Sequence, residues 1–237
     1  MEASRLPQTS ELAPHSEIGE RLRQERQRRG MTVREIARRV GVSPSLISQI
    51  ETGRANPSVS TLYAIAAELD VSLDELMFND RRQAALTATE PPRSVEEVVQ
   101  PAASRKRIHL ASGVEWERLT ARSERDVEFL FVTYDVGGAS TGEGAYQRHS
   151  GHEWGYLLEG RLDVRIGFED YILAPGDAIS FDSTIPHRLA NAGDTPVHAI
   201  WFVLGRVPSA GGEAGGGTAV HDDDLHETPP PRATVTR

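Results

Sequence analysis

Hydrophobic residues recur every three or four positions in the first third of the chain, which is the spacing of amphipathic helices. Glycines and small polar residues interrupt this pattern where helices commonly end and begin. The pattern therefore predicts five helices between residues 16 and 79. They are a helix that ends at Gly30, one from Thr32 to Gly41, one from Ser43 to Gly53, one that opens at Ser58 or Ser60, and a short one over Ser72–Phe78.

From Arg107 onward the hydrophobic period shortens to about two, which is typical of strands. Gly, Pro and Asp residues separate these segments from one another. Many short strands at regular spacing indicate a β-sandwich or a small barrel. The predicted strands are Val127–Val136, Glu153–Leu158, Arg161–Ile166, Asp170–Leu173, Asp177–Phe181 and Val197–Val203.

Changes in composition divide the chain into five regions and predict an α+β protein with two domains. Residues 1–15 are polar and are predicted to form a disordered arm. Residues 80–106 contain Pro91-Pro92 and are predicted to be a linker. The Gly-, Asp- and Pro-rich residues 206–237 are predicted to be a disordered tail. The two domains are then residues 16–79 and residues 107–205.

The overall composition narrows the class of protein. The chain has 237 residues, 38% hydrophobic and 26% charged, which suits a soluble protein. No apolar run approaches the roughly 18 residues of a membrane span, so no membrane partner is expected. The first residues lack the apolar segment of a secretory signal. Because there are no cysteines, disulfides and thiolate metal sites are excluded, and a cytoplasmic location is the default expectation.

The net charge of −9 argues against a general nucleic-acid coat, but the balance in the helical region is different. Between Ser16 and Asn56 there are nine Arg and five Glu, which leaves a local charge of 9 − 5 = +4. A small basic module of this kind can bind phosphates.

The second and third predicted helices have the arrangement of a helix-turn-helix, in which one helix braces another that enters the major groove. Gln49, on the outward side of the third helix, can form two hydrogen bonds to adenine, and the serines there can reach base edges or phosphates. Residues just after this helix, and the start of the second, suit phosphate contact. The predicted DNA-contacting residues are Thr32, Ser43, Pro44, Ser45, Ser48, Gln49, Arg54 and Asn56.

Residues 17–78 resemble the XRE family, the Cro/C1-repressor type of helix-turn-helix. The likeness runs through I-G-E-R-L-R-Q-E-R, M-T-V-R-E-I-A-R-R-V-G-V-S, L-I-S-Q-I-E-T-G-R-A-N-P-S and T-L-Y-A-I-A-A-E-L-D-V-S-L-D-E-L. It implies a five-helix bundle like that of lambda repressor. One difference is Val33, which stands where the family often has Gln at the second position of its second helix.

Two further motifs, Q-R-H-S-G-H-E-W-G-Y-L-L-E-G at 147–160 and H-R-L-A-N at 187–191, resemble those of the cupin superfamily. The intervals of both family motifs are kept. Gln147, Thr141, Asp182 and Thr184 replace a His, two Gly and a Pro of the family pattern. The resemblance covers about residues 107–205 and implies an all-β cupin, which is a double-stranded β-helix or jelly-roll barrel.

In this resemblance His149, Glu153 and His187 form a two-His-one-carboxylate set, the group that binds Fe(II) and leaves coordination sites open. Gln147 is either a weak fourth ligand or a hydrogen-bond donor beside the metal, and His152 falls on the rim. The other reading is a polar pocket without metal, in which these groups bond one another or an organic ligand. The cofactor is therefore open, with one divalent metal as the candidate. Predicted pocket walls are Gln147, Trp154, Tyr156, Phe181 and Trp201.

The order of the two domains resembles the XRE–cupin transcriptional regulators. This resemblance implies a homodimer joined through the cupin domain, a small-molecule effector and a double-stranded DNA operator, with the linker at 79–106 as the place of conformational change. The alternative is an enzyme, because the hydroxypropylphosphonate epoxidases have the same domain order and a mononuclear iron centre. The intact outward set on the third helix and the local positive charge favour the regulator.

Overall fold

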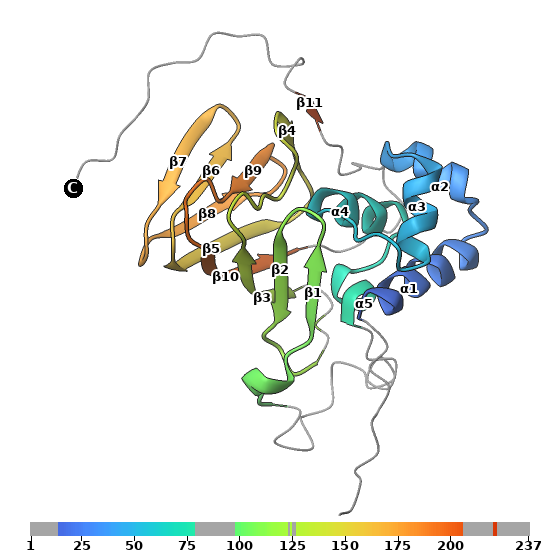
Figure 1. The fold of residues 1–237 in the computed structure, drawn as a ribbon, viewed down its shortest axis with the longest axis horizontal. Coiled ribbons are helices and arrows are strands. Elements are labelled where there is room, and N and C mark those ends of the chain that lie inside the picture. Colours follow the sequence, from blue (N-terminus) through green and yellow to red (C-terminus); the bar gives the residue numbers. More distant parts are fainter. Residues whose placement is uncertain (1–13, 79–97, 123, 125–126, 206–219, 222–237) are drawn as a thin grey trace, which may run out of the picture.

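The computed structural model describes residues 14–78, 98–122, 124, 127–205 and 220–221. It has a small helical region followed by a β domain, so the α+β two-domain prediction is confirmed (Figure 1). Four helices have eight residues or more, and the fifth predicted helix is a segment of six residues. The helices are α1 (Pro14–Arg28), α2 (Val33–Val40), α3 (Pro44–Glu51), α4 (Val59–Glu68) and α5 (Leu73–Phe78).

Local side-chain chemistry sets the ends of α2 and α3. Thr32 and Ser43 each accept a hydrogen bond from a backbone N–H one turn into the helix, Glu35 and Leu46 respectively. Such caps satisfy N–H groups that have no partner within the helix. Gly41 ends α2 with φ 79°, a left-handed conformation in which a side chain would be strained.

Two sheets form the β domain and pack face to face around one hydrophobic core (Figure 1). The larger sheet has the order β1-β2-β3-β10-β5-β8, the smaller one β7-β6-β9, and β4 pairs with β11. The strands are β1 (Arg107–Leu110), β2 (Val114–Arg118), β3 (Val127–Tyr134), β4 (Ala145–Tyr146), β5 (His152–Glu159), β6 (Leu162–Ile166), β7 (Glu169–Leu173), β8 (Ala178–Asp182), β9 (His187–Ala190), β10 (Val197–Leu204) and β11 (Val220–His221).

All six predicted strands are present, shifted by two residues at most. The pattern missed β1, β2 and β9, and also the two-residue strands β4 and β11. Each of β1, β2 and β9 has only four or five residues, too short for a firm period, and their buried positions include Arg118 and His187.

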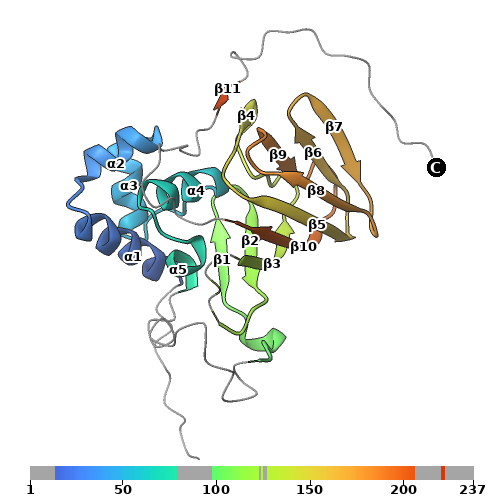
Figure 2. The same cartoon turned by 180° about the vertical axis from the view of Figure 1, so that it is seen from behind.

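The helices pack directly against the β domain, with α4 beside β1 and β2 in both views (Figures 1 and 2). Two backbone hydrogen bonds join the domains: Ala111 N–H donates to Pro57 O at 3.0 Å, and Ser60 N–H donates to Ser140 O at 3.3 Å. The position of α4 therefore depends on both domains. No helix in the described part of the chain is long and apolar enough to cross a membrane.

Most of the regions predicted to be an arm, a linker and a tail lie outside the described residues. The exceptions are informative. α1 begins at Pro14, inside the region predicted as an arm, so that boundary was wrong by two residues. The last part of the predicted linker contains a 3₁₀ turn at Ala102–Ser104.

Candidate DNA-contacting surface and candidate metal centre

The outward face of α3 is polar and accessible. Ser43, Pro44, Ser45, Ser48 and Gln49 are all exposed, whereas Ile47 and Ile50 of the same helix are buried in the bundle. The helix thus presents hydrogen-bonding side chains on one side and core side chains on the other. This is what a helix that reads base edges needs.

Residues around α3 differ in their accessibility. Thr32 and Arg54 are exposed, as a phosphate contact requires. Asn56 is half-buried and lines a small hollow between the domains with Ile108 and His109. Its position suits packing between domains better than contact with DNA.

Only part of the positive charge in the helical region is available to a partner. Four arginines form ion pairs with glutamates or with Asp70 of the same helical region: Arg26, Arg28, Arg29 and Arg39. Within the described residues, the exposed guanidinium groups without an ion pair on or beside α2 and α3 belong to Arg34, Arg38 and Arg54. Of these three, only Arg54 is among the DNA-contacting residues predicted from the sequence.

The end of α3 is held by a buried ion pair to α1. Arg26 Nε and Nη2 donate to the two carboxylate oxygens of Glu51 at 2.6 and 2.8 Å, and Arg26 Nη1 donates to Met31 O at 2.7 Å. Side-chain exposures are 9% for Arg26 and 7% for Glu51. Two parallel hydrogen bonds fix orientation as well as distance, so this pair aligns α3 on α1.

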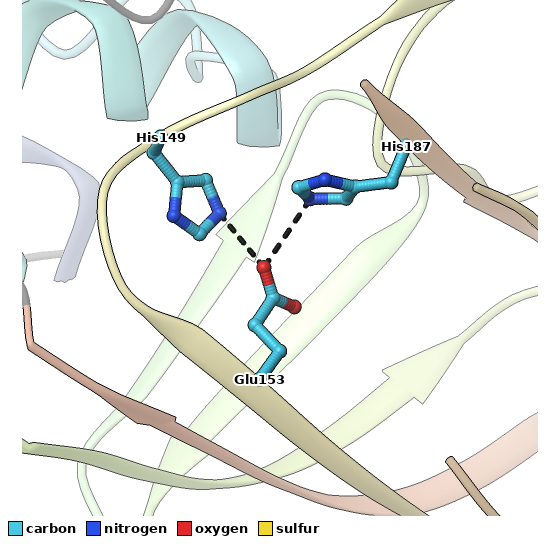
Figure 3. Close-up of side chains that lie close together, drawn as sticks. All are labelled: His149, Glu153 and His187. Carbon is cyan, nitrogen blue, oxygen red and sulfur yellow. Dashed lines mark ion pairs between the residues drawn. The ribbon is translucent and has the colours of Figure 1, made fainter. Parts of the chain in front are cut away.

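In the β domain three polar side chains from separate segments meet (Figure 3). His149 lies in the loop before β5, Glu153 on β5, and His187 at the start of β9. Both imidazoles point at one carboxylate oxygen: His149 Nε2 is 2.8 Å and His187 Nε2 3.2 Å from Glu153 Oε1. One ligand atom from each residue lies within 4.8 Å of the others. The structure therefore brings together the three residues that the sequence predicted as metal ligands.

The other ring nitrogen of each histidine is committed to the backbone. His187 Nδ1 lies 2.9 Å from Ile185 O, and His149 Nδ1 lies 3.1 Å from Ser150 O. A carbonyl oxygen only accepts, so each Nδ1 carries the proton and donates it. Nε2 is therefore the nitrogen of each ring that is left to bind a cation beside the carboxylate, as in metal sites where the other ring nitrogen donates to a backbone carbonyl.

Gln147 and Trp201 complete the surroundings. Gln147 Nε2 lies 3.1 Å from His187 Nε2, and Trp201 Nε1 donates to Glu153 Oε2 at 2.7 Å. Trp201 reaches that oxygen because it crosses over Gly155, where a Cβ would collide with the indole ring. The indole thus fixes the carboxylate with Oε1 turned toward the two imidazoles.

The electrostatics of the cluster favour an ionised carboxylate. Burial raises the pKa of Glu153, but the two imidazoles close to its carboxylate, those of His149 and His187, outweigh burial and hold this pKa well below its usual range. Burial, with the charge of Glu153 adding to it, raises the pKa of Tyr134 nearby.

These residues fit a divalent metal. Although both imidazoles approach Glu153 Oε1 within ion-pair distance, this buried oxygen makes no hydrogen bond of good geometry among the described residues, and neither does Gln147 Oε1. A cation bound by the two Nε2 atoms and the carboxylate would satisfy an oxygen that the protein leaves unsatisfied. It would replace the amide of Gln147 as the partner of His187.

Two predicted pocket residues were placed wrongly. Trp154 and Tyr156 are 39% and 47% exposed on the outer face of the six-stranded sheet. Neighbouring residues of a strand point to opposite faces, so these two cannot share the interior with Glu153. Phe181 and Trp201 do face inward, with the Phe181 ring centroid 5.0 Å from that of His187.

Tyr63 of α4 also lies against the cluster and is not among the residues predicted from the sequence. Its ring stacks on His149 with 4.7 Å between ring centroids, and it is 7% exposed. A signal was present in the sequence. Val59 and the five consecutive residues 62–66 of α4 are aliphatic or aromatic and buried, which is more than one face of a helix can supply and indicates burial on two sides.

Two family models match the chain: a helix-turn-helix model over residues 22–76 and a cupin-domain model over residues 121–203. The HTH-type transcriptional regulator PuuR of Escherichia coli (strain K12) is 29% identical over 180 residues, which cover 76% of this chain and 88% of PuuR. RghRB of Bacillus subtilis (strain 168), described as an uncharacterized HTH-type transcriptional regulator, is 34% identical over 128 residues, covering 51% of this chain and 90% of RghRB.

A similar arrangement of both domains occurs in a crystal structure. An HTH_3 family transcriptional regulator from Vibrio cholerae superposes with a TM-score of 0.55 at 22% identity and covers 81% of this chain and 96% of that one. At this identity the likeness concerns the fold, and it extends over the helical and the β domain together.

Proposed function

This chain belongs to the XRE family of helix-turn-helix transcriptional regulators and carries a C-terminal cupin domain, and from this premise we propose that it reads an operator through α3 and senses a small molecule in the cupin domain. The observation that carries the first part is the capped α3, whose exposed side chains are polar except for Pro44. The side chains of Ser45, Ser48 and Gln49 lie outside the core and can approach base edges.

In the DNA complex Gln49 and Ser45 contact bases, and Arg34, Arg38 and Arg54 contact phosphates. Phosphate contacts position the protein, whereas base contacts choose the sequence. Contacts through the three arginines would make binding weaken as salt rises.

In the cupin domain His149, Glu153 and His187 hold one divalent metal, and the effector binds at the open positions beside it. The metal supplies a Lewis-acidic point to which an oxygen or nitrogen atom of the effector can bind. Trp201 orients the carboxylate, and Phe181 forms an apolar wall. Support comes from the convergence of two imidazoles on a buried carboxylate oxygen that lacks a hydrogen bond of good geometry.

Dimers form through the outer face of the six-stranded sheet. This face carries aromatic and aliphatic side chains in register on three neighbouring strands, and Phe202 packs between Phe129 and Trp154. Exposed apolar patches of this kind mark interaction surfaces. A second copy fits the operator hypothesis, since two-fold symmetry presents two α3 helices to two half-sites.

Selection of bound fragments from a random double-stranded DNA pool tests the first part. Enrichment of one partly palindromic sequence, bound far more tightly than the unselected pool at 150 mM salt, is expected (~10³-fold or more). Binding that stays sequence-independent and disappears with salt would contradict the proposal.

Elemental analysis of protein purified without chelators tests the metal. One metal per chain is expected in the wild type and none in His187→Ala. His152→Ala is the matched control, because His152 lies on the outer side of β5 against Trp154 and should leave metal content unchanged. Wild-type protein that is purified without metal and takes up no added Fe(II) would contradict the proposed metal site. Stoichiometric iron with substrate-dependent oxygen uptake and only salt-sensitive DNA binding would favour the oxidoreductase instead.

Tyr156→Glu is expected to convert the dimer to a monomer by light scattering. Tyr171→Glu is the control, because Tyr171 is similarly exposed, at 43%, but lies on β7 of the other sheet. If Tyr156→Glu remains a dimer, the interface does not lie on the outer face of the six-stranded sheet.

A further inference from the structure

Helix α4 is shared between the two domains. One side of it, including Leu62 and Ile65, belongs to the core of the helical bundle. The opposite side carries Tyr63 into the β domain, where its ring lies 5.6 Å from the ring of Trp116 on β2. A residue of the DNA-binding domain is therefore buried in the cupin domain.

Tyr63 also contacts the candidate metal centre itself. Its ring stacks on His149 at an interplanar angle of 30°, and its hydroxyl donates to Glu128 Oε2 at 3.4 Å. Through its edge the same imidazole presents Nε2 to Glu153 Oε1 at 2.8 Å. His149 thus contacts both the carboxylate of the site and a side chain of the helical domain.

This contact is part of a wider attachment. The backbone hydrogen bonds from Ala111 to Pro57 and from Ser60 to Ser140 hold the start of α4 against the β domain. The attachment leaves the outward residues of α3 exposed. The docked arrangement is therefore compatible with DNA binding and fixes where α3 is presented.

We propose that Tyr63 transmits the occupancy of the cupin site to the DNA-binding domain. The inference rests on the proposed metal site. A metal bound to His149 Nε2 fixes the imidazole in the plane against which Tyr63 stacks, so the loaded site holds the bundle in the docked position. Without the metal the imidazole turns about its side-chain bonds and the stacking surface is lost. The change reaches α4 through direct contact.

The coupling is reciprocal by thermodynamic necessity: if metal fixes the bundle, fixing the bundle tightens metal binding by the same factor. Tyr63 acts here as a positioning residue, because it touches a ligand of the metal and not the metal. Replacing Tyr63 should leave metal binding and docking of the helical bundle each possible, but should remove the coupling between them.

The experiment exploits the absence of cysteines from the chain. Cysteines introduced as Arg38→Cys on α2 and Glu169→Cys on β7, both exposed positions, receive a fluorescent donor and acceptor in the full-length protein. Energy transfer is measured after dialysis against a chelator and then during titration with Zn²⁺. The number of Zn²⁺ bound per chain is measured in parallel.

In the wild-type background Zn²⁺ is expected to change the transfer efficiency and to narrow its distribution, and His187→Ala should abolish this response. Tyr63→Ala should still bind one Zn²⁺ per chain but show no response, with Zn²⁺ affinity lowered by about 5- to 150-fold. Tyr63→Phe keeps the stacked ring and should respond as the wild type does. Tyr63→Leu keeps apolar volume, and so serves if the alanine variant does not fold.

The outcomes separate the two proposals. If wild-type protein binds no Zn²⁺, Fe(II) or Co²⁺, both the proposed metal site and the proposed coupling are wrong. If it binds metal with no change in transfer, or if folded Tyr63→Leu responds as fully as the wild type, the metal site stands and the coupling through Tyr63 is wrong.

Discussion

The outward face of α3 and the polar cluster of the β domain are both small sets of polar side chains, but their surroundings are opposite. Ser45, Ser48 and Gln49 lie in solvent, whereas Glu153 is 3% and His187 0% exposed. The first set contributes little to the stability of its helix, which the buried residues beneath it determine. The members of the second set are buried and lie against one another, so their geometry depends on the packing of the whole β domain.

Because of this difference in burial, we expect the two recognition surfaces to respond differently to substitution. A change on α3 should alter binding with little effect on folding, provided that the residues holding the helix stay in place. A change in the cluster should alter binding and folding together, because its members are buried and joined to one another.

The largest expected effect lies beneath the exposed face, in the Arg26–Glu51 pair. Glu51→Ala leaves a buried guanidinium without its carboxylate, and removal of one partner of a buried pair costs about 3–5 kcal/mol of unfolding free energy. Urea unfolding followed by circular dichroism measures it. Glu35→Ala breaks an exposed pair with Arg39 and should leave stability nearly unchanged; equal losses in both variants would show that burial of the first pair does not matter.

Gly155→Ala tests the linkage between folding and binding in the cluster. The added Cβ forces the Trp201 indole aside, with an expected loss of about 1–3 kcal/mol from overpacking, and it removes the donor that orients Glu153. The free energy of unfolding in urea and the Zn²⁺ affinity should therefore both decrease. The control is Gly142→Ala, where a Cβ meets nothing within 4 Å. Normal Zn²⁺ affinity in a destabilised Gly155→Ala would mean that Trp201 does not position the carboxylate.

Gln49→Ala tests the exposed face itself. Loss of a two-hydrogen-bond contact to a base should cost about 1–3 kcal/mol of operator binding and relax the preference at that base pair. The midpoint of urea unfolding should not move, because the side chain is exposed. Weaker binding to every sequence alike would assign Gln49 to a phosphate rather than a base.

The smallest effect concerns the capping residue of α3. Ser43→Ala removes the hydrogen bond from Leu46 N–H and should lower stability by about 1 kcal/mol. Ser45, two residues further on, makes no capping hydrogen bond, so Ser45→Ala should lower operator affinity alone. If both serines lower stability equally, the distinction between cap and contact on this helix is wrong.

Much of the local structure was predictable because it depends on neighbouring residues. Thr32, Ser43 and Gly41 end or begin helices through bonds and backbone angles within one turn. The ligand set was predictable from its resemblance to the cupin motifs, which keep His149, Glu153 and the later His187 at family intervals. For Trp154 and Tyr156 the alternation of β5 was visible, but the face with these two residues and Leu158 is the more apolar one, and it is the other face, with Glu153, that points inward.

By itself, then, the sequence determined the helix ends, most of the strands, the polar face of α3 and the identity of the three convergent side chains. The tertiary structure alone decided the contact of Tyr63 with His149, the indole of Trp201 over Gly155 and the ion pair between Arg26 and Glu51. The physical reason is distance along the chain. Caps and alternation act between near neighbours, whereas these contacts join residues 25 to 86 positions apart, and only the packing of whole elements brings such residues together.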